Sequence, residues 1–133
     1  MKVTGSCHCG AIAYEAEVDV DRVVICHCTD CQKLTGSAYR VSVGTTRQQL
    51  VVRHGVPAIY VKTADGGARR AQAFCSACGS PLFTYDVDHP EALGLRVGCI
   101  DQRRGLRPVK QIWCQSALPW SMDVHDLPRT ARE

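Results

Sequence analysis

The stretch CHCTDCQKLTG, which runs from Cys26 to Gly36, carries three cysteines in a CxCxxC arrangement. Two further clusters are a CxC pair and a CxxC pair, formed by Cys7 and Cys9 and by Cys75 and Cys78. A glycine directly follows each pair, at Gly10 and Gly79, and supplies the permissive backbone that a tight turn around the sulfurs needs. In such turns backbone amides face the sulfurs and offset their charge as thiolates, which is typical of metal sites.

Seven clustered cysteines can be divided between two zinc ions. Structural zinc takes four ligands in a tetrahedron, so the simplest partition gives one ion the four thiolates of Cys7, Cys9, Cys75 and Cys78. The triplet of Cys26, Cys28 and Cys31 then holds a second ion with one open position, the arrangement expected of a catalytic zinc. Alternatively, Cys99, His27 or a distant residue completes the triplet and makes the second site purely structural.

The composition is that of one soluble domain, expected to span residues 1–133. The chain has a mass of 14.6 kDa, with 45% hydrophobic and 22% charged residues, and no apolar run long enough to cross a bilayer. Nine cysteines without a secretory leader favour metal or redox chemistry in a reducing cytoplasm over a disulfide framework. The net charge of +3 and two basic spots without interleaved aromatics argue against nucleic-acid binding.

Short alternating or β-branched runs separated by turn signals predict a mainly β fold of small antiparallel sheets. The expected strands are residues 11–16, 22–25, 39–43, 50–53, 58–62, 71–74, 82–86, 93–97 and 111–114. One helical turn is expected from Thr29 to Leu34, capped by Thr29 and ended by Gly36.

Four other residues near the clusters are expected to have structural roles. His8 and His27 alternate with cysteines, so in extended segments their rings point away from the metal; both are predicted to lie at the surface or behind the ligands. Cys99 follows an alternating strand and Cys114 neighbours Trp113, so both are expected to be buried as small hydrophobic side chains.

The chain resembles a known family in three strings: GSCHCG from Gly5 to Gly10 followed by Tyr14, the CHCTDCQKLTG stretch, and FCSACGSPLF from Phe74 to Phe83. The segments GCID from Gly98 to Asp101 and IWCQSALPW from Ile112 to Trp120 are similar as well. Nearly the whole chain thus resembles the glutathione-dependent formaldehyde-activating enzyme family, whose domain is also described as the centromere protein V/GFA type.

The resemblance implies an Mss4-like (β-tent) fold stapled by zinc, with the structural and catalytic ions placed as in the partition above. It also implies a carbon–sulfur lyase activity that joins glutathione and formaldehyde into S-(hydroxymethyl)glutathione. A small thiol and an aldehyde would then be the partners, with no nucleic acid or membrane involved. Unlike the family pattern, this chain has cysteines at Cys99 and Cys114, a short loop after Val43 and a compact C-terminus.

A thiol substrate with carboxylates needs cations or amide donors at the rim of the site. Lys33 and Arg40 are the nearest cations in sequence to the triplet, and they are the candidate cosubstrate contacts. Gln32 could orient a ligand thiolate, and Ser37 or Tyr39 could donate to an oxyanion. Two other functions fit the cysteine pattern: a zinc-stabilised protein-binding module and a redox protein that releases zinc on oxidation.

Overall fold

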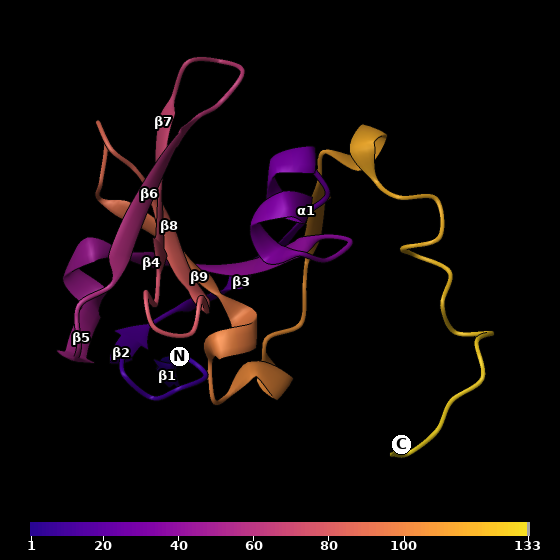
Figure 1. Ribbon diagram of the computed structural model, residues 1–133, viewed down its shortest axis with the longest axis horizontal. Coiled ribbons are helices and arrows are strands. Elements are labelled where there is room, and N and C mark those ends of the chain that lie inside the picture. Colours follow the sequence, from indigo (N-terminus) through magenta and orange to yellow (C-terminus); the bar gives the residue numbers. More distant parts are fainter. Residues whose placement is uncertain (133) are drawn as a thin grey trace.

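The computed structural model describes residues 1–132 and consists mainly of β-strands (Figure 1). The strands are β1 (Lys2–Ser6), β2 (Ala13–Glu17), β3 (Asp19–Cys26), β4 (Arg40–Thr46), β5 (Leu50–His54), β6 (Ala58–Thr63), β7 (Arg69–Phe74), β8 (Pro81–Asp86), β9 (Ala92–Arg96) and β10 (Lys110–Ile112). The one α-helix is α1 (Thr29–Thr35), and short 3-10 turns are η1 (Arg47–Gln49), η2 (Val97–Cys99), η3 (Arg103–Gly105) and η4 (Cys114–Ser116). The mainly β prediction is confirmed: each expected strand overlaps an observed one, and only β1 was missed.

The strands form two sheets. A three-stranded sheet has the order β1-β2-β5, and a seven-stranded sheet has the order β10-β3-β4-β9-β8-β7-β6. All pairs are antiparallel except β10, which runs parallel to β3 at the edge of the larger sheet. This parallel pair brings the residues that follow β10 beside the triplet, because Ile112 pairs with Cys26.

The hydrophobic core contains side chains from both sheets. From the smaller sheet and its loops come Val3, Ile12, Tyr14, Ala16 and Val18; from the larger sheet come Val23, Val43, Ala73, Leu82, Phe83, Leu93 and Leu95. Ile100 and Leu106 close the core from the segment after β9. Alternate residues of β4 face this core, so the others, including Arg40 and Ser42, lie on the opposite face of the larger sheet.

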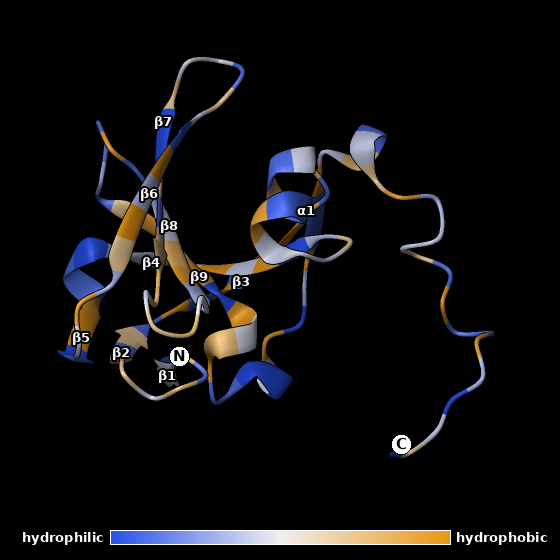
Figure 2. Ribbon diagram, viewed as in Figure 1, coloured by the Kyte–Doolittle hydropathy of each residue, from blue (hydrophilic) through white to orange (hydrophobic). Residues whose placement is uncertain are grey.

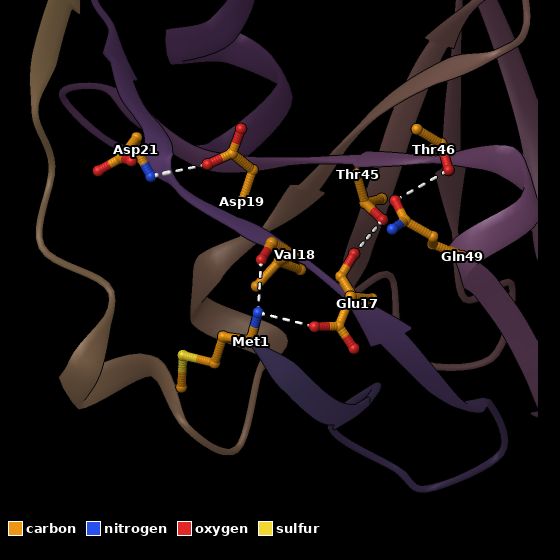
Figure 3. A network of polar contacts seen from close by, with 8 residues as sticks. All are labelled: Met1, Glu17, Val18, Asp19, Asp21, Thr45, Thr46 and Gln49. Atoms are coloured by element: carbon orange, nitrogen blue, oxygen red, sulfur yellow. Dashed lines mark hydrogen bonds and ion pairs between the residues drawn. The ribbon is translucent and has the colours of Figure 1, made fainter.

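Polar contacts join the two sheets at the start of the chain (Figure 3). The amino group of Met1 donates to the carboxylate of Glu17 at 3.0 Å and to the carbonyl of Val18 at 2.9 Å. The hydroxyl of Thr45, on β4, donates to the carbonyl of Glu17 at 2.6 Å. The end of β2 is therefore held both to β1 and to the larger sheet.

The N-cap of helix α1 lies one residue earlier than the sequence predicted. Cys28, not Thr29, is the N-cap, and its sulfur accepts the amide of Cys31 at 3.3 Å. Gly36 ends the helix in the left-handed conformation, with φ of 61°, as the sequence predicted. Much of α1 is coloured hydrophilic in Figure 2, while the last residues of β3, which lead into it, are apolar. No helix in residues 1–132 is long and apolar enough to span a membrane.

Candidate metal centres and the adjoining cleft

The two cysteine pairs come together as a four-sulfur cluster. The ligand atoms of Cys7, Cys9, Cys75 and Cys78 all lie within 4.8 Å of one another, although 66 residues separate Cys9 from Cys75. The sulfurs of Cys7 and Cys9 are 3.6 Å apart, and those of Cys9 and Cys75 are 3.8 Å apart. A tetrahedron with zinc–sulfur bonds of about 2.3 Å has sulfur–sulfur edges of about 3.8 Å, so these donors fit a zinc ion.

Each pair lies on a similar tight turn. The amide of Gly10 donates to the carbonyl of Cys7 at 3.1 Å, and that of Gly79 donates to Cys75 at 2.8 Å. Both glycines have positive φ, 79° and 78°, which a residue with a side chain adopts only with strain. The amide of Ile12 donates to the Cys7 sulfur at 3.3 Å, so the backbone offsets thiolate charge there.

The triplet forms a second cluster in the segment that joins β3 to α1. The sulfurs of Cys26, Cys28 and Cys31 lie within 4.8 Å of one another, and Cys26 and Cys31 are buried. The chain thus contains two cysteine clusters that could hold metal ions, one of four sulfurs and one of three. The sulfurs of Cys99 and Cys114 belong to neither cluster.

The surroundings of the triplet shift the pKa values of two of its thiols in opposite directions. A hydrogen bond from the Cys31 thiol lowers the pKa of Cys26 to about 5, against the opposing effect of burial. The amide and thiol of Cys28 and the positive charge of Arg40 assist this shift. The pKa of Cys31 is raised because its thiol donates to Cys26 and is buried. These shifts favour Cys26 over Cys31 as the sulfur that ionises first.

A cleft of about 400 Å³ adjoins the triplet, and all three of its cysteines line that cleft. The lining comes from α1 and the segment after β10 and from the β6–β7 hairpin, which Figure 1 shows as separate arms of the fold. The ion pair between Lys62 of β6 and Asp30 of α1, at 2.7 Å, links the two sides. The four cysteines of the other cluster do not line this cleft. The triplet therefore adjoins a cleft, whereas the other cluster meets solvent through its exposed cysteines, Cys9 and Cys78.

Of the two candidate cosubstrate contacts, only one lines the cleft. Arg40, on β4 opposite Cys26, does so, whereas Lys33 is exposed on α1 and is not part of the lining. Gln32 does not bond a thiolate: its amide nitrogen donates to the carbonyls of His27 at 2.8 Å and Ser116 at 3.0 Å. Gln32 thereby ties α1 to the segment after β10. Ser37 and Tyr39 also lie outside the cleft lining.

Of the two positions predicted for His27, at the surface or behind the ligands, the structure excludes the surface. His27 is fully buried, its Nε2 lies 2.8 Å from Oε1 of Gln111, and its ring contacts that of Tyr39 edge-on at 5.4 Å. The parallel pairing of β10 with β3 covers this side chain, which the local sequence does not reveal. His8, by contrast, is exposed, as predicted.

The two isolated cysteines differ in burial. Cys99 is partly buried against the core, and its thiol donates to the carbonyl of Pro81 at 3.2 Å. Cys114 is exposed, so its predicted burial is wrong. Trp113, directly after β10, has a positive φ of 56°, so the chain turns before position 114 and carries that side chain away from the sheet.

Several cleft residues were not singled out from the sequence as site residues. They are Lys62, Arg70, Gln72, Thr84 and Trp113, contributed by β6, β7, β8 and the end of β10. Only the pairing of these strands brings the residues to the triplet. The one local signal was the pair of basic residues at Arg69 and Arg70, one of the two basic spots in the sequence. Arg69 is exposed, and only Arg70 lines the cleft.

Comparisons with known proteins agree with the cysteine pattern. The family described as "Glutathione-dependent formaldehyde-activating enzyme" matches residues 2–116. A Halomonas elongata protein named "Putative glutathione-dependent formaldehyde-activating enzyme" is 33% identical over 113 residues, covering 76% of this chain and 67% of that protein. The solved structure of a Rhodobacter sphaeroides protein has a TM-score of 0.63 at 23% identity, covering 81% of this chain and 98% of the other; it supports the fold alone. The chain belongs to the glutathione-dependent formaldehyde-activating enzyme family.

Proposed function

We propose that this chain is a zinc-dependent carbon–sulfur lyase of the S-(hydroxymethyl)glutathione synthase type. One observation carries the proposal: the three-sulfur cluster lines a cleft large enough for a small substrate, whereas the four-sulfur cluster does not line it. Cys7, Cys9, Cys75 and Cys78 would hold a structural zinc ion, and Cys26, Cys28 and Cys31 a catalytic one. The cytoplasmic location expected from the cysteine usage stays a prediction.

The proposed reaction adds a thiol to a small aldehyde. The thiol loses its proton, its sulfur forms a bond to the carbonyl carbon, and the carbonyl π electrons move to oxygen. That oxygen then takes up one proton, so the number of protons is unchanged overall. A free thiol with a pKa near 8.5 is only a few per cent thiolate at neutral pH, which limits the uncatalysed addition. Cys26, Cys28 and Cys31 would hold a zinc ion with one further coordination position, where the ion would favour the thiolate form of a bound thiol.

The chain's own residues fix the three sulfurs and line the cleft beside them. Cys26 is fixed on β3, Cys28 caps α1, and Cys31 is buried in the first turn of α1, so the three sulfurs have little freedom to rearrange. The ring of Trp113 is half exposed at the rim of the cleft, where it can cover the aldehyde. Thr29 and Gln115 are exposed on the lining, so the cleft is open to water and the product oxygen can take its proton from solvent.

The proposal is tested by metal content and catalysis in matched cysteine variants. Cys26→Ser removes a triplet sulfur, whereas Cys114→Ser alters an exposed cysteine outside both clusters and serves as the control. We expect wild type and Cys114→Ser to hold two zinc ions per chain and to accelerate exchange between glutathione–formaldehyde adduct and free reactants, measured by exchange NMR. Cys26→Ser should hold one zinc ion and lose the acceleration. A Cys26→Ser protein with two zinc ions and full acceleration would refute the catalytic assignment.

A further inference from the structure

Strand β6 forms one edge of the larger sheet, and one side of its backbone is unpaired. Its six residues pair with β7 in an unbroken antiparallel register, and no other strand of the described chain joins it. The β6–β7 hairpin projects beyond the other strands in Figure 1. Residues 1–132 supply no partner for the amides and carbonyls on the free side of β6, and such an edge is a template for pairing with another chain.

The hydrogen bonds of the hairpin show which backbone groups face that free side. The amide of Ala64 donates to the carbonyl of Ala68 at 2.8 Å, so these two residues form a hydrogen-bonded pair. Hydrogen-bonded and non-hydrogen-bonded pairs alternate along an antiparallel ladder. The backbone groups of Thr63, Val61 and Ile59 therefore point away from β7 and toward the free side.

The side chains along this edge are mostly apolar and exposed. Ile59 is 47% exposed, Tyr60 55% and Val61 45%. The one charged side chain of β6, Lys62, forms an ion pair with Asp30 at 2.7 Å, so its charge is balanced within the chain. A regular edge strand with consecutive exposed apolar side chains and no unbalanced charge favours association with another strand.

The other sheet edges carry features that normally prevent such pairing. On the free side of β1, the amide of Asp101 donates to the carbonyl of Thr4 at 2.9 Å, so the segment after β9 covers that edge. Strand β5 has a shift of register against β2 and carries Arg53. Strand β10 has only three residues. In the part of the chain that the structure describes, β6 is thus the edge that lacks these protections.

A second copy of this chain fits the edge, because a strand related to its copy by a two-fold axis runs antiparallel to it. With the axis at Val61, Ile59 of each copy lies opposite Thr63 of the other, so all three outward-facing residues are paired. Tyr60 then lies opposite Lys62, so no like charges face each other. The aliphatic side chains of Ile59 and Val61 from both copies lie on one face and form a single cluster.

We propose that two copies of this chain form a symmetric dimer through β6, which joins their seven-stranded sheets into one continuous sheet. The axis lies at Val61 and not at Tyr60, because an axis at Tyr60 would place Thr63 opposite Pro57, which has no amide to donate. The three pairs about Val61 supply about six main-chain hydrogen bonds. The inference does not rest on the proposed function, since none of the paired residues belongs to a cysteine cluster.

The test places charges at the proposed axis. We expect wild type to sediment at twice the chain mass of 14.6 kDa in analytical ultracentrifugation. Val61→Lys and Val61→Glu should each sediment as monomers, because two like charges would face each other in either dimer. An equal mixture of these two variants should recover the dimer, because opposite charges then face each other, and this recovery also shows that both variants fold. The control is Val51→Lys, which changes a 41% exposed valine on β5 and should stay dimeric.

Hydrogen exchange of single amides, measured by NMR, gives a second readout. The amides of Ile59, Val61 and Thr63 should exchange at least about 10-fold faster in Val61→Lys than in wild type, because they lose their partners with the dimer. The amides of Tyr60 and Lys62, which bond to β7, should stay protected in both proteins.

Three results would overturn the inference. One is a wild type that remains a monomer at concentrations up to about 1 mM. Another is a dimer that survives in Val61→Lys with its amides at Ile59 and Thr63 still protected, since the interface would then lie elsewhere. The third is a mixture of the two Val61 variants that stays monomeric although each variant keeps the circular dichroism of wild type.

Discussion

The amide of Cys31 donates to the sulfur of Cys28 at 3.3 Å, so one cysteine of the triplet caps the helix that carries another. Two functions are combined in one side chain: Cys28 satisfies a free amide at the start of α1 and supplies a sulfur to the cluster. Serine is a good N-cap residue but a poor zinc ligand, whereas alanine is neither, so the two functions can be separated.

Cys28→Ser is expected to retain the cap and lose the metal, whereas Cys28→Ala should lose both. We predict that each variant holds about one zinc ion fewer than wild type, and that the alanine variant is less stable than the serine variant by about 1 kcal/mol, the usual value of an N-cap. Zinc analysis and urea unfolding of the two variants at equal zinc content provide the measurement. Equal stability of the two variants would show that the Cys28 cap contributes nothing.

Removal of metal by a chelator is expected to proceed in two stages. The triplet offers three protein sulfurs beside an open cleft, whereas the other cluster offers four and joins the start of the chain to β7 and β8. We predict that the first zinc ion leaves with the β-sheet circular dichroism unchanged, and that loss of the second unfolds the chain. Native mass spectrometry during titration with chelator, read beside circular dichroism, measures both stages. Simultaneous loss of both ions with unfolding would contradict the assignment of a structural and a catalytic site.

Gly5 lies against Tyr14 in the smaller sheet and leaves no room for a side chain. A Cβ at position 5 would come within 2.4 Å of Cζ of Tyr14 and 2.6 Å of the carbonyl oxygen of Cys99. We predict that Gly5→Ala destabilises the zinc-loaded protein by about 1–3 kcal/mol, as overpacking does in a buried site. Gly66→Ala is the control, since a Cβ there meets nothing within 4 Å. Thermal unfolding of both variants measures the difference, and equal melting temperatures would contradict the prediction.

The same contact explains why β1 was missed in the sequence. Its sequence KVTGS contains one strongly apolar residue, Val3, and places a glycine where a buried strand would normally carry a large side chain. Tyr14 from β2 covers that glycine and supplies the missing apolar contact. Strands with β-branched runs, such as β4 and β6, were predicted because their own side chains carry the signal.

The residues of the candidate site were likewise predicted only in part from the sequence. The cysteine clusters are visible in the sequence because the spacing of ligands within each cluster is local. Arg70 and Trp113 could not be assigned to the cleft, because the β4–β9 pair and the parallel β10–β3 pair, which place β7 and the end of the sheet near the triplet, depend on long-range pairing. The exposure of Cys114 depends on the positive φ of Trp113, a conformation that tryptophan seldom adopts and that no local pattern predicts.

The contact between Cys9 and Cys75 spans 66 residues, which sets an order of events during synthesis. At roughly 5–20 residues per second, the ribosome adds Cys75 roughly 3–13 s after Cys9. In that interval Cys7, Cys9 and the triplet are the only cysteines of the growing chain. An ion captured early therefore meets all three sulfurs of the triplet but only two of the four sulfurs of the other cluster. The three-sulfur cluster can fill before the four-sulfur cluster exists.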